Sequence, residues 1–249
     1  VALSRAQEMK DVYIKGDLEQ AGIHASPDAL AETDRLQAIF DQNLAKISER
    51  AEKYWQISYL NVRSLKCHKE DVEKDNFLMS ADVFSLGETH LEKGEEIHFD
   101  GYAGVFASHG KGKGVSTFYN IECAPVNSIT SEKYSGIQLR FGKFDAIFLY
   151  LSSGCNKEEI LNHLESWIVE KVPTVIMGDI NIDYDRNNKL IKALENLGFE
   201  QLIQEATRTS GTLIDHIYVN KEMYSLNVKT QLDGMYYSDH DAITIHIPK

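Results

Sequence analysis

The spacing of apolar residues changes near residue 55, and this change constrains the fold more than any other feature of the sequence. Before it, apolar residues between Leu30 and Ala51 recur at the intervals of an amphipathic helix. From Trp55 onwards, apolar runs are short and are separated by turn residues or by polar segments of helix length. We therefore expect a long helix within residues 1–54 and a separate, β-rich domain in residues 55–249.

The second segment is predicted to contain many strands and few helices. Gly142-Lys143 separates two apolar runs and predicts a β-hairpin, whereas Pro173 ends a helix just before a buried strand. Hairpins give antiparallel neighbours, so the pattern favours a layered α/β sandwich with mixed sheets over a purely parallel sheet. Strands are expected at 57–62, 82–88, 101–108, 114–120, 137–141, 144–151, 174–180, 214–220 and 242–247, and helices at 69–79, 160–170 and 188–197.

Charge narrows the choice of partners. The chain has 26 Lys and Arg residues against 38 Asp and Glu residues, a formal net charge of −12 at pH 7. A protein that binds nucleic acid through bulk electrostatics is normally basic, because phosphate neutralisation supplies most non-specific affinity. A phosphate-rich substrate would therefore need a local basic patch or a bound cation.

Cysteine usage and hydropathy suggest where the protein works. Cys67, Cys123 and Cys155 lie far apart and have no metal-ligand spacing, which favours a reducing, intracellular compartment. The sequence has no apolar run of transmembrane length, so we expect no membrane partner. Because the chain begins at Val1 rather than Met, we also expect it to be a piece of a longer protein.

Polar residues recur where the predicted strands end or begin. Asn61 and Glu88 end the first two strands, and Asp179 ends a later one. Asp215 opens another strand, and His240 precedes the last one. A single Asn or Glu at such a position is usually a turn residue, but a series of five in one chain favours a common site on a rigid scaffold.

The order of these motifs resembles the endonuclease/exonuclease/phosphatase superfamily, which includes DNase I, exonuclease III and the apurinic endonucleases. The resemblance covers residues 55–249 and implies a DNase I-like, four-layered α/β sandwich of two mixed sheets flanked by helices. The Thr207-Arg208 pair followed by Leu213-Ile214-Asp215-His216 looks most like the endonuclease domains of LINE-type retrotransposons and other mobile elements. The matching motifs are Leu60-Asn61-Val62-Arg63, Gly87-Glu88-Thr89-His90, Leu149-Tyr150, Gly178-Asp179-Ile180-Asn181, Ile214-Asp215-His216 and Ser238-Asp239-His240.

Phosphodiester hydrolysis explains why a metal site belongs in this set. A divalent cation neutralises phosphate oxygens and stabilises the leaving oxygen. Hard oxygen ligands suit Mg²⁺ or Mn²⁺, so Glu88 is the first candidate ligand, followed by Asp239 and Asn61. Arg63 and Arg208 are candidate contacts to the substrate phosphate, because each lies next to one of the motifs.

The remaining residues are expected to act on the reacting groups. Asp179 is suited to orient or deprotonate the attacking water, with Asn181 fixing its position. His240 would donate a hydrogen bond or proton to the phosphoryl oxygen, and the family pattern gives Asp215 the role of orienting that imidazole. Tyr150 would hydrogen-bond the developing charge, as the resemblance to apurinic endonucleases implies.

The first segment carries a second resemblance. Val1-Ala2-Leu3-Ser4-Arg5 and the residues that follow it look like the C-terminal end of Pif-type DNA helicases. A helicase end fused to a nuclease resembles the replication proteins of Helitron-like transposons. The resemblance implies a helicase remnant with a linking amphipathic helix in residues 1–54, the rest of a helicase polypeptide as partner, DNA as substrate and a nuclear location.

Two alternatives compete with a metal-dependent DNA endonuclease. The first is another phosphoesterase of the same fold, acting on a phospholipid, a nucleotide or a phosphotyrosyl-DNA bond. The second is a non-catalytic module that positions a helicase. The sequence leaves open the preferred DNA structure, the choice between endonuclease and exonuclease action, the number of metal ions and the oligomeric state.

Overall fold

The computed structural model describes residue 35 and residues 51–110, 113–184 and 188–249. The chain divides into two units, Val1–Ser48 and Glu49–Lys249. Apart from Arg35, the first unit lies outside the described residues, and so do the predicted long helix and the segment that resembles a helicase. The boundary expected at residue 55 stays a prediction, and the fold described below is that of the second unit.

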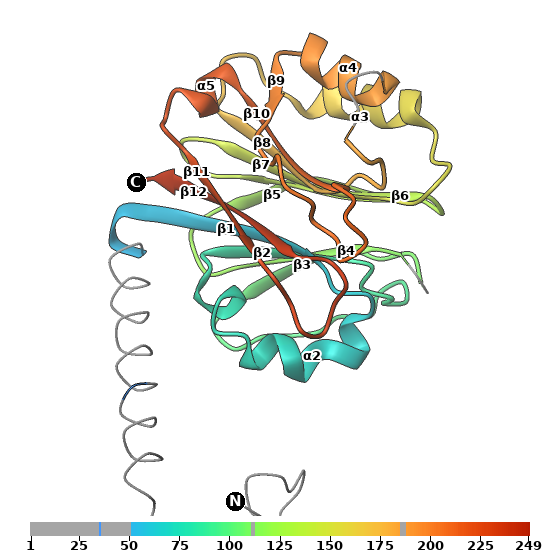
Figure 1. Cartoon of the computed structure of the whole chain (residues 1–249), viewed down its shortest axis with the longest axis vertical. Coiled ribbons are helices and arrows are strands. Elements are labelled where there is room, and N and C mark those ends of the chain that lie inside the picture. Colours follow the sequence, from blue (N-terminus) through green and yellow to red (C-terminus); the bar gives the residue numbers. More distant parts are fainter. Residues whose placement is uncertain (1–34, 36–50, 111–112, 185–187) are drawn as a thin grey trace, which may run out of the picture. The chain divides into compact units, whose positions relative to one another are not determined.

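Two mixed sheets of six strands each form the second unit (Figure 1). The order in the first sheet is β11 (Lys229–Asp233), β12 (Ala242–Pro248), β1 (Tyr54–Asn61), β2 (Val83–Gly87), β4 (Val115–Tyr119) and β3 (Ala103–Ala107). The order in the second sheet is β9 (Phe199–Gln201), β10 (Asp215–Asn220), β8 (Thr174–Asp179), β7 (Asp145–Leu151), β6 (Tyr134–Arg140) and β5 (Ala124–Thr130). The expected sandwich of two mixed sheets is confirmed.

The two sheets repeat one pattern of pairing. A single parallel pair lies at the centre of each, β1–β2 in the first sheet and β8–β7 in the second, and every other neighbouring pair is antiparallel. Equivalent strands contact each other across the interface: β1 contacts β8, β2 contacts β7 and β12 contacts β10. The centre of each sheet is therefore built from three equivalent strands, β1, β2 and β12 in the first sheet and β8, β7 and β10 in the second.

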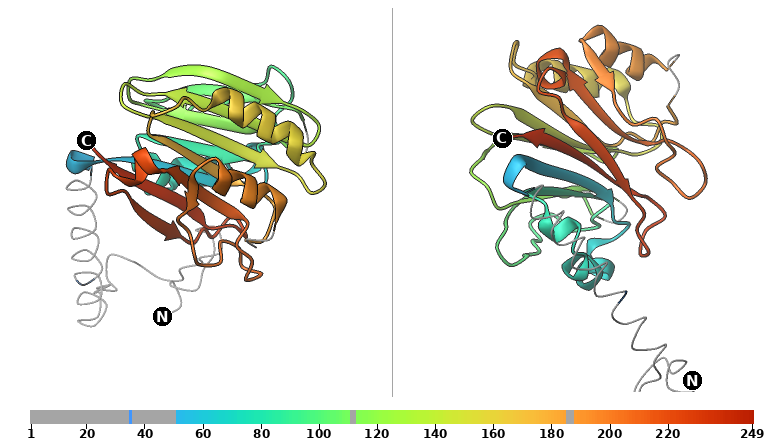
Figure 2. Two further views of the ribbon diagram at one scale, coloured as in Figure 1. Left: turned by 90° about the horizontal axis from the view of Figure 1, so that it is seen from above. Right: turned by 60° about the vertical axis from the view of Figure 1, so that its left-hand side comes forward.

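Apolar side chains fill the space between the sheets and cover their outer faces. Ile57 and Ile243 from the first sheet pack in one buried cluster with Phe148, Val175 and Ile217 from the second. On the outer side of the second sheet lie α3 (Lys157–Trp167) and α4 (Lys189–Asn196), and on that of the first lies α2 (Leu65–Lys74) (Figures 1 and 2). Four layers result, helix, sheet, sheet and helix, because each sheet must bury both of its apolar faces.

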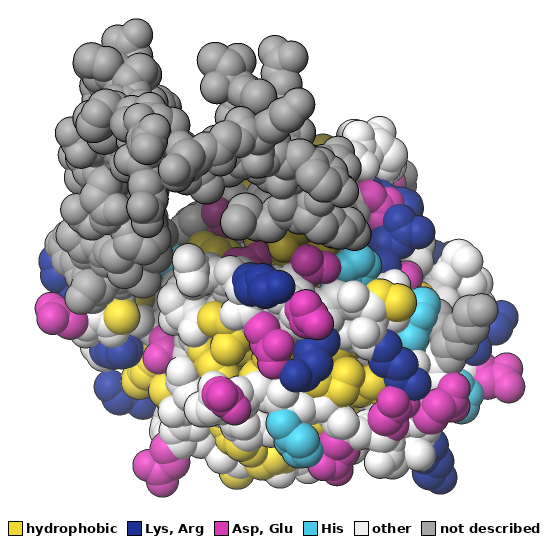
Figure 3. All heavy atoms as spheres, turned by 90° about the horizontal axis from the view of Figure 1, so that it is seen from below, with side chains coloured by type: hydrophobic (Ala, Val, Ile, Leu, Met, Phe, Trp, Pro, Cys, Tyr) yellow, Lys and Arg dark blue, Asp and Glu magenta, His cyan; other side chains and the backbone are white. Residues whose placement is uncertain are grey.

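The first helix differs from the expected one at both ends. The Ser64 side chain caps it by accepting a hydrogen bond from the backbone N–H of Cys67, so α2 begins at Leu65 instead of residue 69. It ends at Lys74, before a short 3₁₀ turn, η3 (Leu78–Ser80), because Asp75 is extended. Figure 3 views the face that carries α2, where acidic and basic side chains intermingle. Within α2, Lys69 Nζ lies 2.7 Å from Glu73 Oε1.

Four short or exposed elements escaped the sequence prediction. They are the edge strands β5, β9 and β11 and the four-residue helix α5 (Lys221–Tyr224). Most residues of β5 are exposed and β11 is exposed or half-buried, so neither shows the alternation of apolar residues that marks a strand with one buried face. Among the described residues, no helix is both long and apolar enough to cross a membrane.

Two glycines allow the strands to approach where the polar residues gather. A Cβ on Gly178 would lie 1.9 Å from the Leu149 carbonyl oxygen of β7, and φ of Gly178 is +154°. A Cβ on Gly87 would lie 2.0 Å from the Tyr59 hydroxyl. Because Gly178 meets backbone atoms of β7, glycine is required one residue before Asp179, whereas a side chain at residue 87 would displace the Tyr59 ring.

Candidate active site

Asn61 and Asp179 join the two sheets at one edge of the sandwich. Asn61 is the last residue of β1, Asp179 is the last residue of β8, and both are buried. Asn61 Nδ2 donates to Asp179 Oδ2 at 2.9 Å, and the backbone N–H of Asn181 donates to Asp179 Oδ1 at 2.8 Å. These two hydrogen bonds fix the orientation of the Asp179 carboxyl group.

Asp215 and His240 form a second pair between the sheets. Asp215 begins β10 next to Asp179 of β8, and His240 lies just before β12. His240 Nδ1 lies 2.8 Å from Asp215 Oδ2, and the Thr207 hydroxyl donates to the same oxygen at 2.9 Å. All three residues are buried, with the His240 side chain 4 % exposed, so Asp215 holds the imidazole in one orientation and leaves Nε2 for another partner.

Glu88 and Tyr150 form the third pair. Glu88 follows β2 directly, and Tyr150 lies in β7 beside Asp179 of β8. The Tyr150 hydroxyl donates to Glu88 Oε1 at 3.1 Å. Tyr150 is buried and Glu88 is half-buried, so the carboxyl group of Glu88 lies between the interior of the sandwich and solvent.

A cluster of charged residues lies at the solvent side of these pairs. Asp239 accepts from Arg63 Nη1 at 3.1 Å through Oδ1, and from Arg208 Nε at 2.8 Å and Nη2 at 2.7 Å through Oδ2. The Arg63 and Arg208 side chains keep 55 % and 38 % of their surface exposed. Both guanidinium groups therefore remain accessible to an anion while Asp239 holds them in place.

The backbone of residues 207–212 explains why these side chains converge. Arg208 pairs with His240 as an isolated β-bridge, and the Asp241 N–H donates to the Thr207 carbonyl at 2.8 Å. The Thr209 N–H donates to the Asp239 carbonyl at 3.0 Å. This short pairing directs Thr207 toward the buried Asp215 and Arg208 toward the more exposed Asp239.

Backbone strain is concentrated at this edge. Glu88 has φ of 48° and Asn181 has φ of 52°, both in the left-handed region that non-glycine residues rarely adopt. Arg63 has φ of 53°. Such conformations cost about 1–3 kcal/mol each, and they persist at sites where the surrounding structure holds a side chain for a purpose.

Burial dominates the protonation of the two inner carboxyl groups. Burial, followed by the nearby charge of Asp215, raises the pKa of Asp179 to about 8, although His240 and the hydrogen bond from Asn61 act in the opposite direction. Burial also raises the pKa of Asp215, against the effect of its hydrogen bonds to His240 and Thr207. Without a cation, the inner part of the site therefore disfavours two negative charges.

For His240 and Asp239, hydrogen bonds and neighbouring charges outweigh burial and set the direction of the pKa shift. Burial alone would lower the pKa of His240, but the hydrogen bond to Asp215 and the charges of Asp215, Asp179 and Asp239 raise it. Burial would raise the pKa of Asp239, but the hydrogen bond from Arg208 and the charges of His240, Arg208 and Arg63 lower it. The raised pKa values of Asp179, Asp215 and His240 favour their protonated forms, whereas the lowered pKa of Asp239 favours an ionised carboxylate at the solvent side of the site.

The donor set fits a divalent cation. Asp179, Asp215 and His240 offer ligand atoms that all lie within 4.8 Å of one another, and buried Asp215 Oδ1 has no hydrogen-bond partner. Asn61 lies beside this group, since its Nδ2 donates to Asp179, while its Oδ1 accepts from the Arg63 backbone N–H at 3.0 Å. Glu88 adds a half-buried carboxyl group held by Tyr150, and hard divalent cations prefer such oxygen ligands. Both oxygens of Asp239 accept from guanidinium groups, but a carboxylate oxygen has more than one lone pair, so Asp239 can still serve as a ligand.

All the residues singled out in the sequence lie at this edge, and the structure adds two more. Asn181 reaches Asp179 through its backbone N–H, whereas its side chain is exposed. Thr207 was not assigned a role, because no spacing rule links it to Asp215 before the chain folds. Tyr59 was missed as well: its hydroxyl is buried without a hydrogen-bond partner, and burial together with Asp179 and Asp215 raises the pKa of Tyr59.

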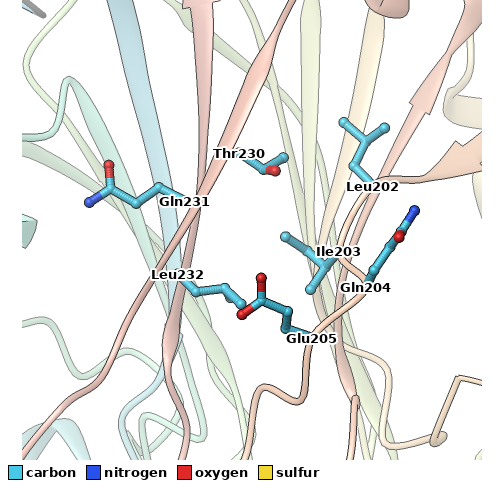
Figure 4. A pocket seen from close by; sticks show the side chains of 7 residues that line it. All are labelled: Leu202, Ile203, Gln204, Glu205, Thr230, Gln231 and Leu232. Atoms are coloured by element: carbon cyan, nitrogen blue, oxygen red, sulfur yellow. The ribbon is translucent and has the colours of Figure 1, made fainter.

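Among the cavities lined by described residues, one lies at the edge of the sandwich and another lies beside the site. A cavity of about 400 Å³ lies between β11 and the segment after β9, where Thr230 and Leu232 face Ile203 and Glu205 (Figure 4). It contains none of the paired residues. A second cavity, of about 620 Å³, lies directly beside Asp239 and is lined by Arg63, His68, Thr209, Tyr236, Tyr237, Ser238 and Asp239.

The fold and the polar edge define a class of protein, the two-sheet α/β sandwiches with a site at the strand ends. The family model described as "Endonuclease/Exonuclease/phosphatase family" matches residues 43–240, and the chain belongs to this family. No curated protein is similar enough in sequence to count as a match.

Solved structures of several proteins share the fold. The endonuclease domain of TRAS1, a telomere-specific non-LTR retrotransposon, has 15% sequence identity and a TM-score of 0.61, covering 78% of this chain and 98% of that chain. An AP endonuclease from Archaeoglobus fulgidus has 17% identity and a TM-score of 0.62, covering 77% and 98%. The 3'-5' exonuclease NExo from Neisseria meningitidis has 17% identity and a TM-score of 0.63, covering 77% and 99%. At these identities the likeness establishes the fold.

Proposed function

We propose that this chain is a divalent-metal-dependent phosphodiesterase that cuts DNA internally, as an endonuclease of a mobile-element protein. The observation that carries the proposal is the set of three hydrogen-bonded pairs between the sheets, Asn61–Asp179, Glu88–Tyr150 and Asp215–His240. A domain that only binds a partner has no need of a buried Asp–His pair beside a second buried carboxyl group. Structural similarity to a retrotransposon endonuclease and to an AP endonuclease supports DNA as the substrate.

Each pair has a chemical task in this proposal. A cation bound nearby would favour the ionised form of Asp179, whose pKa burial otherwise raises. The ionised carboxylate, fixed by Asn61 and by the Asn181 N–H, can then orient the attacking water and accept its proton. His240, held by Asp215, donates from Nε2 to a phosphoryl oxygen, and its raised pKa favours the protonated donor form. The Tyr150 hydroxyl would turn from Glu88 and donate its hydrogen bond to the charge that develops on the phosphoryl oxygens.

The charged residues account for substrate binding by an acidic protein. Arg63 and Arg208 each offer guanidinium N–H groups that can meet a phosphate next to the reacting one. Glu88, with Asn61 and Asp239, would hold Mg²⁺ or Mn²⁺, which neutralises phosphate charge and polarises phosphorus when bound. Because the formal net charge is −12, DNA binding is expected to be weak and salt-sensitive without the cation.

The finer assignment to a helicase–nuclease fusion stays a prediction. The matched family model begins at residue 43, so residues 1–42 lie outside it. Their resemblance to a helicase end, with the remaining helicase as partner and the nucleus as location, comes from the sequence motifs alone. Copurification of this protein from its natural source with an ATPase activity stimulated by DNA would test this part separately.

Nicking of supercoiled plasmid tests the activity. We expect wild-type protein to nick the plasmid with Mg²⁺ or Mn²⁺ but not with EDTA, and Glu88→Gln or His240→Gln to lower the nicking rate about 10²- to 10³-fold. Exposed Asp100→Asn is the matched control and should leave the rate unchanged. Pure, folded protein that leaves every DNA form intact but hydrolyses a phospholipid, nucleotide or phosphotyrosyl substrate would contradict DNA as the substrate. Absence of divalent-cation binding by calorimetry would contradict metal dependence.

A further inference from the structure

Two adjacent tyrosines lie just before the catalytic histidine on the loop between β11 and β12. Tyr236 is 79% exposed, the largest exposure among the large apolar and aromatic side chains of the described residues. Tyr237 and His68 lie beside it, with ring centroids 5.0 Å apart for Tyr236–Tyr237 and 5.8 Å apart for His68–Tyr237. The loop runs down beside α2 in Figure 1, so three aromatic rings from two elements form one cluster next to the site.

The Tyr236 ring is fixed in place although most of its surface is exposed. The Tyr236 hydroxyl donates to Asp71 Oδ1 at 2.9 Å, and the Tyr237 hydroxyl donates to Asp75 Oδ2 at 2.9 Å. Asp71 also accepts from His68 Nδ1 at 2.9 Å. Both tyrosines are therefore tied to α2 by their hydroxyl groups, and a ligand that stacks on Tyr236 would lose little ring mobility on binding.

The cavity beside this cluster has one aromatic side and one charged side. Its volume of about 620 Å³ lies in the range of cavities that hold small ligands. Arg63 and the Thr209 loop face the aromatic rings, and the Arg63 side chain is 55% exposed. The acidic groups around the cavity are engaged, Asp71 with His68 and Tyr236, and Asp239 with Arg63 and Arg208.

We infer that this cavity binds an unpaired nucleobase next to the scissile phosphate, stacked on Tyr236, with its own phosphate at Arg63. This inference rests on the proposed function and names the substrate class: DNA that is single-stranded or locally unpaired. An aromatic face beside a guanidinium group matches one nucleotide, a flat ring joined to an anion. A base within a duplex has its faces covered by its neighbours, so it can stack on Tyr236 only after it leaves the helix.

Binding measurements separate this inference from catalysis. All variants are made in a His240→Gln background with Mg²⁺, so that DNA stays intact, and the probes are a fluorescent single-stranded oligonucleotide and the duplex of the same sequence. Tyr236→Ala should weaken single-strand binding about 5- to 100-fold, because stacking of one base contributes that much, and should change duplex binding less than about twofold. Tyr236→Phe keeps the ring and should stay within about threefold of the parent.

A matched control and a spectroscopic signal complete the test. Tyr224 in α5 is also exposed, at 55%, and Tyr224→Ala should leave both affinities unchanged. A 2-aminopurine base in the single strand should be quenched on binding to the parent and to Tyr236→Phe, but not to Tyr236→Ala.

Three results would overturn the inference: equal loss of single-strand and duplex binding, unchanged single-strand binding of Tyr236→Ala, or 2-aminopurine quenching that survives that substitution. If wild-type protein nicks plasmid with Mg²⁺ and any of these is observed, only the inference fails. If wild-type protein neither cuts nor binds any DNA, the proposed function fails first.

Discussion

The two sheets share one pairing pattern but present different chemistry at their ends. The first sheet contributes Asn61, Glu88 and His240 at the ends of β1, β2 and β12. The second contributes Asp179, Tyr150 and Asp215 from the equivalent strands β8, β7 and β10. Each residue of the first set is hydrogen-bonded to its equivalent in the second.

The difference between the sheets lies in burial and charge. The second sheet carries the two deeply buried acids, Asp179 and Asp215, whose pKa values burial raises. The first sheet supplies their partners: an amide that donates to Asp179 and an imidazole that can share the charge of Asp215. The comparison teaches that neither sheet has a complete site, because each functional group is positioned by a residue from the other sheet.

Neutralising the central acid of the second sheet should have the largest effect. Asp179→Asn keeps the shape of the side chain but cannot accept a proton from water, so plasmid nicking should fall about 10³-fold. The same substitution removes a buried carboxyl group crowded by Asp215, so the Tm in EDTA should rise. The Asp100→Asn control should change neither value. Activity retained within about tenfold would contradict the assignment of Asp179 to proton transfer.

A buried histidine of the second sheet allows a test of how strongly that sheet excludes charge. Burial lowers the pKa of His216 from 6.5 to about 4, and its ring contacts the Tyr218 hydroxyl and the Leu213 carbonyl. Because the folded pKa is lowered, the unfolded chain binds the proton more readily, and stability present above pH 6.5 is lost as pH falls toward 4. At about 1.36 kcal/mol per pKa unit, the loss is about 3 kcal/mol.

Urea unfolding of wild-type protein and His216→Gln across this pH range measures that contribution. Whatever the stability of the variant at pH 7.5, its curve should lack the extra decline of about 3 kcal/mol between pH 6.5 and 4. Parallel curves for the two proteins would contradict the neutral, buried state of His216.

A smaller effect is expected where the second sheet supports its own acid. The Thr207 hydroxyl donates to Asp215 Oδ2 and accepts from the backbone N–H groups of Ile214 at 3.2 Å and Asp215 at 3.0 Å. Thr207→Val keeps the shape but removes the acceptor of the two backbone N–H groups and leaves Asp215 Oδ2 with His240 alone. We therefore expect a loss of about 1–3 kcal/mol in stability and about tenfold in nicking rate. Thr207→Ser should restore most of both. Equal effects of the two substitutions would exclude the hydroxyl as the cause.

The strongly patterned parts of the fold could be predicted from sequence. Central strands such as β1, β7 and β8 are buried along most of their length, so their apolar runs were recognised. The edge strands β5 and β11 are exposed or half-buried and are held by backbone pairing to a neighbour that the sequence does not name. Their prediction would require the tertiary arrangement itself.

The residues of the site could likewise be predicted only where they adjoin a strongly patterned strand. Asn61, Glu88, Asp179, Asp215 and His240 stood out because each ends or precedes a recognisable strand. The pairing of Asp239 with Arg63 and Arg208 could not be predicted, since it depends on the isolated bridge that places residues 207–212 beside residues 239–241. The aromatic cluster around Tyr236 depends on contacts between α2 and a distant loop. Asp71 and Tyr236, which are hydrogen-bonded there, lie 165 residues apart in the chain.

A double-mutant cycle on the Asp215–His240 pair tests most directly whether the two sheets act as one catalytic unit. Nicking rates with Mg²⁺ are measured for wild-type protein, Asp215→Asn, His240→Gln and the double variant, with folding checked by circular dichroism. If Asp215 acts through His240, the double variant should be no slower than His240→Gln alone, within about threefold. Losses that multiply, so that the double variant is slower by the product of the two single effects, would contradict the central claim.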